Sequence, residues 1–311
     1  MKKFPALIIT YYPASDFYQR LTLFYEELEQ IIIVDNGSDS ATRARLEEEA
    51  QKRPEALEII FNDQNLGVAT ALNQGFRWAL EKGYSHLFAF DQDSQPSPGT
   101  MTALQNFVHH APDRSSLAIL SSVPRDLDVD VYARFLRPKK SIFFERVPCD
   151  GEMLTDISFT ITSGSLYNLT AYQELGPFRD DFFIDYVDTE YCLRANQAGY
   201  KIVALCDAYL EHQLGARQKR ELLGRKHYPT FHSPLRWYYI SRNRIPMLKK
   251  YALRFPHWLS FEIVSASYIF LRMMLFEDQK KAKINAFLHG TWDGLRGRMG
   301  KISEKTEKTL K

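Results

Sequence analysis

The chain has 311 residues, of which 45% are apolar, and a formal net charge of +2. This content suffices for one large core, or for a core with a smaller attached region, and excludes an intrinsically disordered chain. The charge is uneven: residues 1–216 carry 19 Lys and Arg against 31 Asp and Glu, a net of −12, whereas residues 217–311 carry 21 against 7, a net of +14. A basic C-terminal third suggests contact with an anionic membrane or nucleic acid; the alternative is a solvated basic face.

Three cysteines occur without CxxC spacing: Cys149, Cys192 and Cys206. We therefore expect no disulfide framework, and the N-terminal residues do not match a signal peptide. The longest apolar stretch, Trp258 to Phe276, is interrupted by Glu262 and Arg272, so we expect it to fall short of a membrane span. The expected compartment is the cytoplasm.

Up to about residue 123, apolar β-branched runs alternate with helical patterns, which predicts βαβ units around a parallel sheet. The expected strands are Ala6–Thr10, Gln30–Val34, Leu57–Phe61, His86–Phe90 and Leu117–Ser122. The expected helices between them are Asp16–Leu28, Ala41–Gln51, Val68–Lys82 and Pro98–His109.

The rest of the chain changes character twice. Val129 to Thr162 is irregular and strand-rich, which indicates a hairpin or an insertion. A helix at Tyr186–Gln197, capped by Gly199, and a strand at Lys201–Leu205 follow. Residues 217–311 form an appended helical region, with patterns around Leu235–Tyr251, His257–Phe276 and Gln279–Leu295.

In an open parallel sheet, ligands bind beyond the carboxyl ends of the strands. The first run ends at Thr10-Tyr11-Tyr12 and the second at Asp35-Asn36-Gly37-Ser38. Asp35 could accept a hydrogen bond from the imide N–H of a nucleobase, and Tyr12 could stack on the base. The alternative for the second segment is a strand-to-helix turn with an N-cap.

Asn65-Leu66-Gly67 follows the third run and opens a helix. A glycine there lets backbone N–H groups approach an anion, which the helix dipole favours; the alternative is a plain glycine turn. The segment matches neither GxGxxG nor a Walker loop.

The fourth run leads to Asp91 and Asp93, and side-chain alternation would point both carboxylates the same way. Two converging carboxylates repel unless a cation lies between them, and Mg²⁺ or Mn²⁺ binds one or two protein carboxylates plus substrate phosphates. His212, after the short strand-like segment Ala208–Leu210, is a candidate third ligand, and its imidazole would favour Mn²⁺ somewhat.

Asp185, Asp188 and Glu190 lie within six residues at the start of a predicted helix. Glu190 is explained by a helical ion pair with Arg194, four residues later. Asp185 and Asp188 lie among aromatic residues, where a carboxylate with a raised pKa could serve as a general base.

With these residues assembled, the chain resembles the inverting family 2 glycosyltransferases of the GT-A fold, from Leu7 to about Gly215. The segments that carry the likeness are Thr10-Tyr11-Tyr12, Val34-Asp35-Asn36-Gly37-Ser38, Asn65-Leu66-Gly67, Asn73-Gln74-Gly75 and Asp91-Gln92-Asp93. The resemblance implies a GT-A α/β domain over residues 1–216, with a mainly parallel sheet, followed by the helical region 217–311.

The resemblance also implies roles for individual residues. The expected donor-binding residues are Thr10, Tyr12, Asp35, Asn65, Gly67 and Asp91, and the expected metal ligands are Asp93 and His212. The family usually has Glu-Asp where this chain has Val187-Asp188, so the role of catalytic base carries over to Asp188, with Asp185 as the fallback.

Within the family, residues 90–94 and 183–190 are similar to those of bacterial rhamnosyltransferases of cell-surface polysaccharide synthesis, which use dTDP-β-L-rhamnose and form α-linkages. The expected reaction is transfer of L-rhamnose to a lipid-linked saccharide. The C-terminal helices would then contact the inner face of the plasma membrane, or instead cover the core or form a dimer. The residues expected at the membrane are the aromatics Trp237, Tyr238, Tyr239 and Trp258 and the cations Arg236, Arg242, Arg244, Lys249 and Lys250.

The sequence supports four alternative functions to different degrees. The Gly-rich, basic N-terminal signature expected of a sugar-nucleotide nucleotidyltransferase is absent. A catalytically silent scaffold that binds a nucleotide sugar, and an enzyme of the same family with another donor, stay open. No motif that reads nucleic acid is visible, so we expect no nucleic-acid partner.

Overall fold

The computed structural model describes residues 3–110, 115–126, 131–139, 141–212, 220–222, 225–227 and 231–310. The chain divides into two compact units. The sheet unit comprises Met1–Leu136, Arg146–Asp180 and Val187–His212, and the helical unit comprises Arg137–Glu145, Asp181–Tyr186 and Gln213–Lys311. The expected domain boundary at residue 216 lies outside the described residues.

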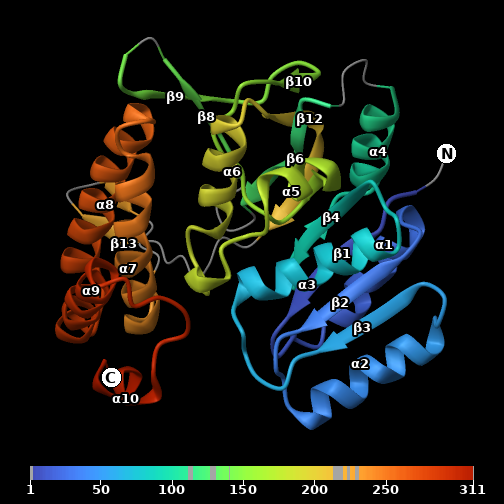
Figure 1. Ribbon diagram of the computed structural model, residues 1–311, viewed down its shortest axis with the longest axis horizontal. Helices are drawn as coiled ribbons and strands as arrows, with labels where there is room; N and C mark the ends of the chain where they lie inside the picture. The colour runs from blue at the N-terminus through green and yellow to red at the C-terminus, as the bar shows by residue number, and fades with distance from the viewer. Residues whose placement is uncertain are drawn as a thin grey trace. The chain divides into compact units, whose positions relative to one another are not determined.

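The sheet unit is built on one large mixed sheet (Figure 1). Its strand order is β10-β12-β6-β11-β4-β1-β2-β3, with β5 paired to β12 and β7 paired to β6. The strands are β1 Ala6–Thr10, β2 Ile31–Asp35, β3 Leu57–Phe61, β4 His86–Asp91, β5 Gln95–Pro96, β6 Leu117–Asp126, β7 Val131–Tyr132, β10 Met153–Leu154, β11 Ser165–Asn168 and β12 Lys201–His212.

The main pairings are parallel, which confirms the predicted fold class. Strand β1 pairs in parallel with β2 and β4, β2 with β3, and β6 with β12. Strand β11 runs antiparallel between β4 and β6, and the sequence pattern does not predict it. Its four residues, Ser165–Asn168, are too few for a clear strand pattern.

Helices cover the sheet because its strands are apolar on both sides. Every residue of β1 and β2 is buried, and parallel strands of this kind need helices on both faces. Leu21 and Phe24 of α1 and Met101 and Leu104 of α4 belong to the same core cluster. The helices are α1 Phe17–Glu27, α2 Ser40–Lys52, α3 Val68–Glu81, α4 Thr100–His110, α5 Leu169–Leu175 and α6 Val187–Gln197, and a 3₁₀ turn spans Asp180–Phe182.

A disulfide joins Cys149 to Cys206, so the expectation of no disulfide framework was wrong. Strand β10 pairs antiparallel with β12, which aligns Met153 with Leu205 and brings the two cysteines to a Cα–Cα distance of 5.1 Å. Their separation of 57 residues gave no local signal of this pairing. The free Cys192 is buried.

The helical unit contains three long helices, α7 Pro234–Tyr251, α8 Pro256–Phe276 and α9 Lys280–Leu295, and the short α10 Glu304–Thr309. Two small hairpins, β8 Phe135–Pro138 with β9 Phe144–Val147 and β13 Arg220–Leu222 with β14 Arg225–His227, complete the elements. By length and composition α8 could cross a membrane, although the sequence reading expected it to fall short; among the described residues it is the one helix of that kind.

The aromatic residues expected at a membrane surface are instead buried. Trp237, Tyr238 and Tyr239 are each 2% exposed and belong to the core of the helical unit, and Trp258 is 1% exposed. Arg242 is completely buried, so these residues cannot lie at headgroup depth. The helical unit needs large apolar side chains for its own core, and the sequence pattern does not distinguish that use from an interface.

Helices α7 and α9 approach closely because α9 has glycines where the backbones meet. A Cβ atom on Gly290 would lie 2.2 Å from both the Ser241 hydroxyl and the Tyr238 carbonyl oxygen. A Cβ atom on Gly294 would lie 2.5 Å from the carbonyl oxygen of Arg242. The backbones of α7 and α9 can approach this closely only because positions 290 and 294 carry no side chain.

Replacing Gly290 by Ala should therefore destabilise the helical unit by about 1–3 kcal/mol, because the backbones must separate. Urea unfolding followed by circular dichroism measures the change. Thr291→Ala on the same helix is the control and should differ from wild type by less than about 0.5 kcal/mol. Equal stability of Gly290→Ala and the control would contradict the close packing.

Candidate active site

The carboxyl ends of β4, β1, β2 and β3 meet at one edge of the sheet. In the strand register Thr10 pairs with Asp35, and Asp35 pairs with Phe61. Ile9, next to Thr10, pairs with Asp91. The sheet thus brings together the ends of the runs from which the donor-binding residues were predicted.

Asp35 is fully buried and organises the ends of β1 and β2. Its Oδ2 accepts hydrogen bonds from the Thr10 hydroxyl at 3.1 Å and the Ser38 hydroxyl at 2.6 Å, and its Oδ1 accepts from the Ser38 N–H at 2.9 Å. Ser38 Oγ also accepts from the N–H of Tyr12 at 2.8 Å. The carboxylate therefore fixes the backbone on which Tyr12 stands.

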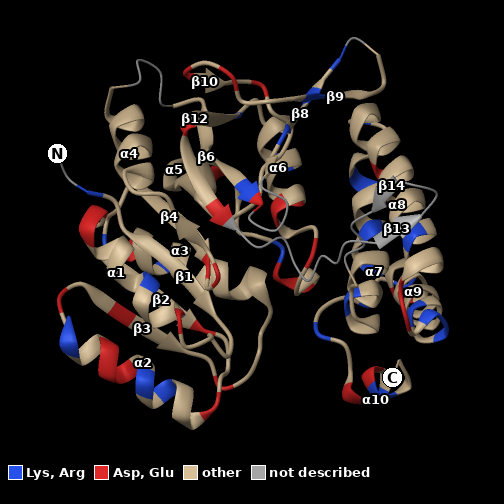
Figure 2. Ribbon diagram, turned by 180° about the vertical axis from the view of Figure 1, so that it is seen from behind, with Lys and Arg blue, Asp and Glu red and all other residues tan. Residues whose placement is uncertain are grey.

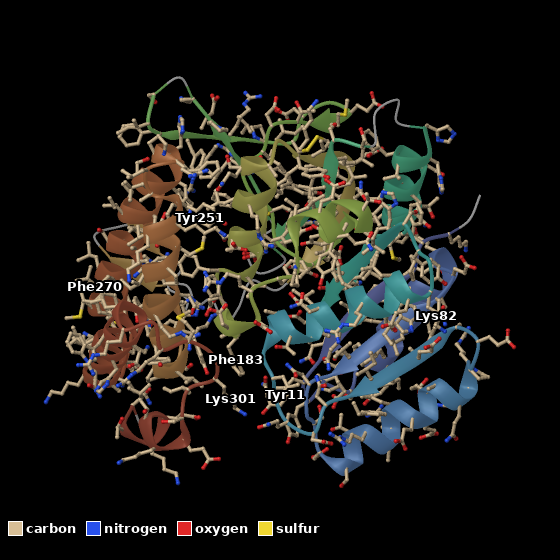
Figure 3. The ribbon with its side chains drawn as sticks, in the orientation of Figure 1. Tyr11, Lys82, Phe183, Tyr251, Phe270 and Lys301 are labelled. Atoms are coloured by element: carbon tan, nitrogen blue, oxygen red, sulfur yellow. A yellow bond between two sulfur atoms is a disulfide. The ribbon has the colours of Figure 1, made fainter. Side chains whose placement is uncertain are left out.

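Tyr11 and Tyr12 are half-exposed at this edge, and Figure 3 labels Tyr11. Their rings meet edge to face with centroids 4.8 Å apart. Tyr12 has a left-handed backbone, φ 48°. In such an exposed pair, the face of a single ring offers a flat apolar surface to a ligand.

An asparagine network holds the loop before α3. Asn36 Oδ1 accepts hydrogen bonds from Asn62 Nδ2 at 3.2 Å and from the N–H of Leu66 at 3.0 Å, and Asn36 Nδ2 donates to Asn65 Oδ1 at 3.2 Å. Asn65 Oδ1 also accepts from the N–H of Gly67 at 2.9 Å. Asn65 therefore holds its own loop, and the sequence reading missed the contribution of Asn36 and Asn62.

Gly67 is the N-cap of α3, and no side chain caps this helix. Its φ of 90° lies in the left-handed region, where a residue with a side chain would be strained. The first turn of α3 thus directs uncapped backbone N–H groups away from the helix, as an anion site requires.

Asp91 ends β4, and Asp93 lies in the turn that follows. The N–H of Ser94 donates to the carbonyl of Asp91 at 3.1 Å and closes this turn. Strand alternation therefore does not orient Asp93, contrary to expectation, because the strand has already ended. Asp93 is exposed and Asp91 half-buried, so both carboxylates are accessible to solvent.

Gln92 ties this turn to the end of β1, a role that the sequence reading missed. Its side-chain oxygen accepts a hydrogen bond from the N–H of Tyr11 at 2.7 Å, and its carbonyl accepts from Arg20 at 2.9 Å. Ser163, just before β11, supports the other side, since its hydroxyl accepts from the N–H of Asp91 at 3.2 Å. The small residues of Thr162–Ser165 were the available signal for that support.

The backbone at His212 lies beside this turn. Strand β12 pairs with β5 so that Glu211 aligns with Gln95, two residues after Asp93. The side chain of His212 lies outside the described residues, so its role as a metal ligand stays a prediction. Among the described side chains, no group of three or more His, Cys, Asp or Glu residues could hold a metal ion.

The two carboxylates nevertheless suit a divalent cation. Mg²⁺ and Mn²⁺ sites that act on phosphates commonly use one or two protein carboxylates, and substrate oxygens and water complete the shell. Asp91 and Asp93 provide two such carboxylates, one at the end of β4 and one in the turn that follows.

Asp188 lies in the first turn of α6 and is half-buried. Its Oδ1 accepts a hydrogen bond from the N–H of Thr189 at 2.7 Å, which limits rotation of the carboxylate. Glu190 is 1% exposed and forms an ion pair with Arg194 at 2.8 Å, as the helical spacing predicted. Glu190 therefore has a structural role.

Asp185 belongs to a strained segment of the helical unit, in which Figure 3 labels Phe183. Phe183, Asp185 and Tyr186 have positive φ values of 66°, 63° and 64°. Arg236 binds Asp185 Oδ1 at 3.1 Å, whereas the buried Oδ2 has no hydrogen-bond partner. Burial raises the pKa of Asp185, and Arg236 opposes that shift.

Two buried residues of α7 hold the strained segment. Asn243 Nδ2 donates to the carbonyl oxygens of Phe182, Ile184 and Asp185 at 2.8–3.0 Å. Arg242 donates to the carbonyl of Phe182 at 2.8 Å and to Asn243 Oδ1 at 3.0 Å. These contacts compensate for the cost of the left-handed residues.

Comparison with known proteins gives a consistent result. The family model for glycosyl transferase family 2 matches residues 16–176, just over half of the chain. A relative from Shigella flexneri, the dTDP-rhamnosyl transferase RfbF, is 29% identical over 301 residues, which cover 95% of this chain and 96% of the relative.

Solved structures show the same fold at low identity. Residues 1–349 of TarS from S. aureus match with a TM-score of 0.58 and 13% identity, over 96% of this chain and 82% of that one. GalNAc-T7, solved with UDP, GalNAc and Mn²⁺, matches with a TM-score of 0.54 and 12% identity, over 71% of this chain and 44% of that one. These likenesses confirm the predicted GT-A fold.

The raised pKa of Asp185 predicts a pH dependence of stability. An acid whose pKa is higher in the folded state stabilises that state fully below its ordinary pKa, about 3.9, and loses this contribution as the pH rises to the raised value. The stability of wild type relative to Asp185→Asn should therefore fall as the pH increases through this window. Urea midpoints of both proteins across a pH series measure this change in relative stability. A difference in stability that stays constant with pH would contradict a raised pKa of Asp185.

Proposed function

The chain belongs to glycosyl transferase family 2, and on that premise we propose that it transfers L-rhamnose from dTDP-β-L-rhamnose to a saccharide acceptor. The observation that carries the sugar assignment is the match to a dTDP-rhamnosyl transferase over nearly the full length of both chains. The mixed sheet with its polar edge supplies the kind of site that this reaction needs.

The donor binds at the carboxyl edge of β4, β1, β2 and β3. The base stacks on the half-exposed Tyr12, which Asp35 holds through Ser38. The diphosphate lies near the turn 91–94 and the uncapped start of α3 at Gly67, where backbone N–H groups favour negative charge. TarS, whose fold is similar, has been solved with UDP-GlcNAc, which supports a nucleotide sugar at this type of site.

Asp93 and His212 would hold Mg²⁺ or Mn²⁺, with Asp91 contacting the ribose or the metal shell. A cation there supplies positive charge to the diphosphate while the leaving group gains negative charge. The carboxylates orient the site before the donor binds, and their exposure at the turn leaves room for phosphate oxygens.

Asp188 acts as the general base. Its carboxylate takes the proton of the acceptor hydroxyl while that oxygen forms a bond to the anomeric carbon, and the bond from this carbon to the phosphate oxygen breaks. The nucleotide diphosphate leaves on the opposite face, so the configuration inverts. The hydrogen bond from Thr189 holds Asp188 in one orientation, which the reaction geometry needs.

Asp188→Asn should abolish turnover, with kcat lowered by roughly 10²–10⁴, because an amide cannot accept the proton. Donor affinity should be nearly unchanged, since a general base acts on the chemical step. Calorimetric titration with dTDP and steady-state transfer assays separate the two effects. Asp207→Asn, which alters an exposed acid on β12, is the matched control, and near-normal transfer by Asp188→Asn would rule out this base.

A donor panel tests the sugar and the metal together. Transfer should be highest with dTDP-L-rhamnose, should fall to background after chelation by EDTA, and should return with Mn²⁺ or Mg²⁺ because a cation must neutralise the leaving diphosphate. Binding of the nucleotide sugar without any transfer or hydrolysis would instead identify a scaffold. Full activity in EDTA would contradict the proposed requirement for a divalent cation.

The acceptor and the location follow as further parts of the proposal. A lipid-linked saccharide at the inner face of the plasma membrane suits a cytoplasmic protein that adds rhamnose during synthesis of a surface polysaccharide. Such an acceptor requires the enzyme to work at a membrane surface.

A further inference from the structure

Helix α8 of the helical unit carries an exposed apolar row that its own core does not use. Five large side chains on it are 49–61% exposed: Ile263, Val264, Tyr268, Leu271 and Leu275. Positions 264, 268, 271 and 275 repeat at helical spacing and lie on one face. We call these five residues the α8 stripe.

Neither Glu262 nor Arg272, the acid and the arginine of α8, is an exposed residue. Glu262 is 8% exposed, and it binds Arg244 at 2.7 Å and the hydroxyl of Tyr186 at 2.6 Å. The guanidinium of Arg272 lies over the ring of Tyr268, 5.2 Å from its centroid. Every exposed position of α8 is therefore uncharged, and Figure 2 shows the helix almost entirely in the colour of uncharged residues.

Exposed cations lie just beyond both ends of the helix. Arg254 precedes it, and Lys280 and Lys281 follow it at the start of α9. Helix α9 adds a second exposed apolar row, Leu288, Trp292 and Leu295, with Arg296 over the Trp292 ring at 4.3 Å. Apolar side chains flanked by cations, with aromatic residues beside arginine, suit the boundary between acyl chains and anionic headgroups.

The helix is also fixed along its inner side. Trp258, Glu262 and Met273 are buried, and Phe270, labelled in Figure 3, packs against Trp237 and Phe287 with ring centroids 6.2 and 5.7 Å apart. A membrane-spanning position would break these contacts and the buried ion pair of Glu262. If α8 contacts a bilayer, it can keep these contacts only by lying in the plane of the membrane surface.

We propose that the α8 stripe is a docking surface for an anionic lipid bilayer, in which α8 lies flat and inserts its apolar side chains to the depth of the acyl boundary. The inference deepens the proposed function, because it would place the enzyme where a lipid-linked acceptor is found, but binding to lipid is measured without donor or acceptor. The proposal also assigns membrane contact to the exposed residues of the α8 stripe, in place of the buried aromatic residues that were predicted from the sequence.

Flotation of the full chain with vesicles tests the proposal. Wild type should float with phosphatidylcholine–phosphatidylglycerol vesicles, and Val264→Glu with Leu271→Glu should weaken the partitioning by at least about tenfold, since two apolar contacts are lost and two acids are added. The matched control is Val131→Glu with Met153→Glu, which makes the same kind of change at exposed positions of the sheet unit and should float like wild type.

A second variant, which leaves the α8 stripe unchanged, tests lipid binding even if the stripe variant folds poorly. Lys280→Glu with Lys281→Glu should lose binding to anionic vesicles to an extent that high salt reproduces in wild type, because the attraction is electrostatic. Circular dichroism should show unchanged helix content in both variants.

The proposal would be overturned if wild type failed to float with anionic vesicles, or if the stripe variant floated as well as wild type. It would also be overturned if wild type did not bind lipid but sedimented as a dimer, and the stripe variant abolished that dimer. The last result would assign the stripe to a second copy of the chain. Lipid binding with no glycosyl transfer to any acceptor would leave this inference standing while the proposed function fails.

Discussion

The site depends on the in-register parallel pairing of β4, β1, β2 and β3. Because β1 and β2 are buried on both faces, slippage between them would expose or clash whole rows of apolar side chains. The same register places Thr10 beside Asp35, with Asp91 one strand away. A constraint that belongs to the core therefore sets the positions of the polar residues at its edge.

The ends of the first four strands were predictable from sequence because each apolar run gives way to polar residues there, even where those residues are still buried, as Thr10 and Asp35 are. The residues that join those ends were harder to predict. Asn36 and Gln92 act through contacts that are distant along the chain, and the disulfide of Cys149 arises from strand pairing rather than from a local motif. Asp93 fell in a turn, where the alternation of a strand no longer applies.

The basic C-terminal third shows why charge counts say little about location. Arg242 is completely buried and binds backbone carbonyls, and Arg244 is paired with Glu262, so both cations serve the interior. Aromatic residues that suggested an interface form the core. The exposed apolar row on α8 became visible only once the structure showed which side of the helix is covered.

A single displacement with one base, starting from dTDP-β-L-rhamnose, fixes the anomeric configuration of the product, so this configuration tests the proposed mechanism most directly. NMR of the purified product, through the one-bond carbon–proton coupling at the new anomeric centre, distinguishes the two outcomes. An α-linked rhamnose, the inverted configuration, is the expected product. A β-linked product would contradict it, because retention requires a second displacement or a different mechanism.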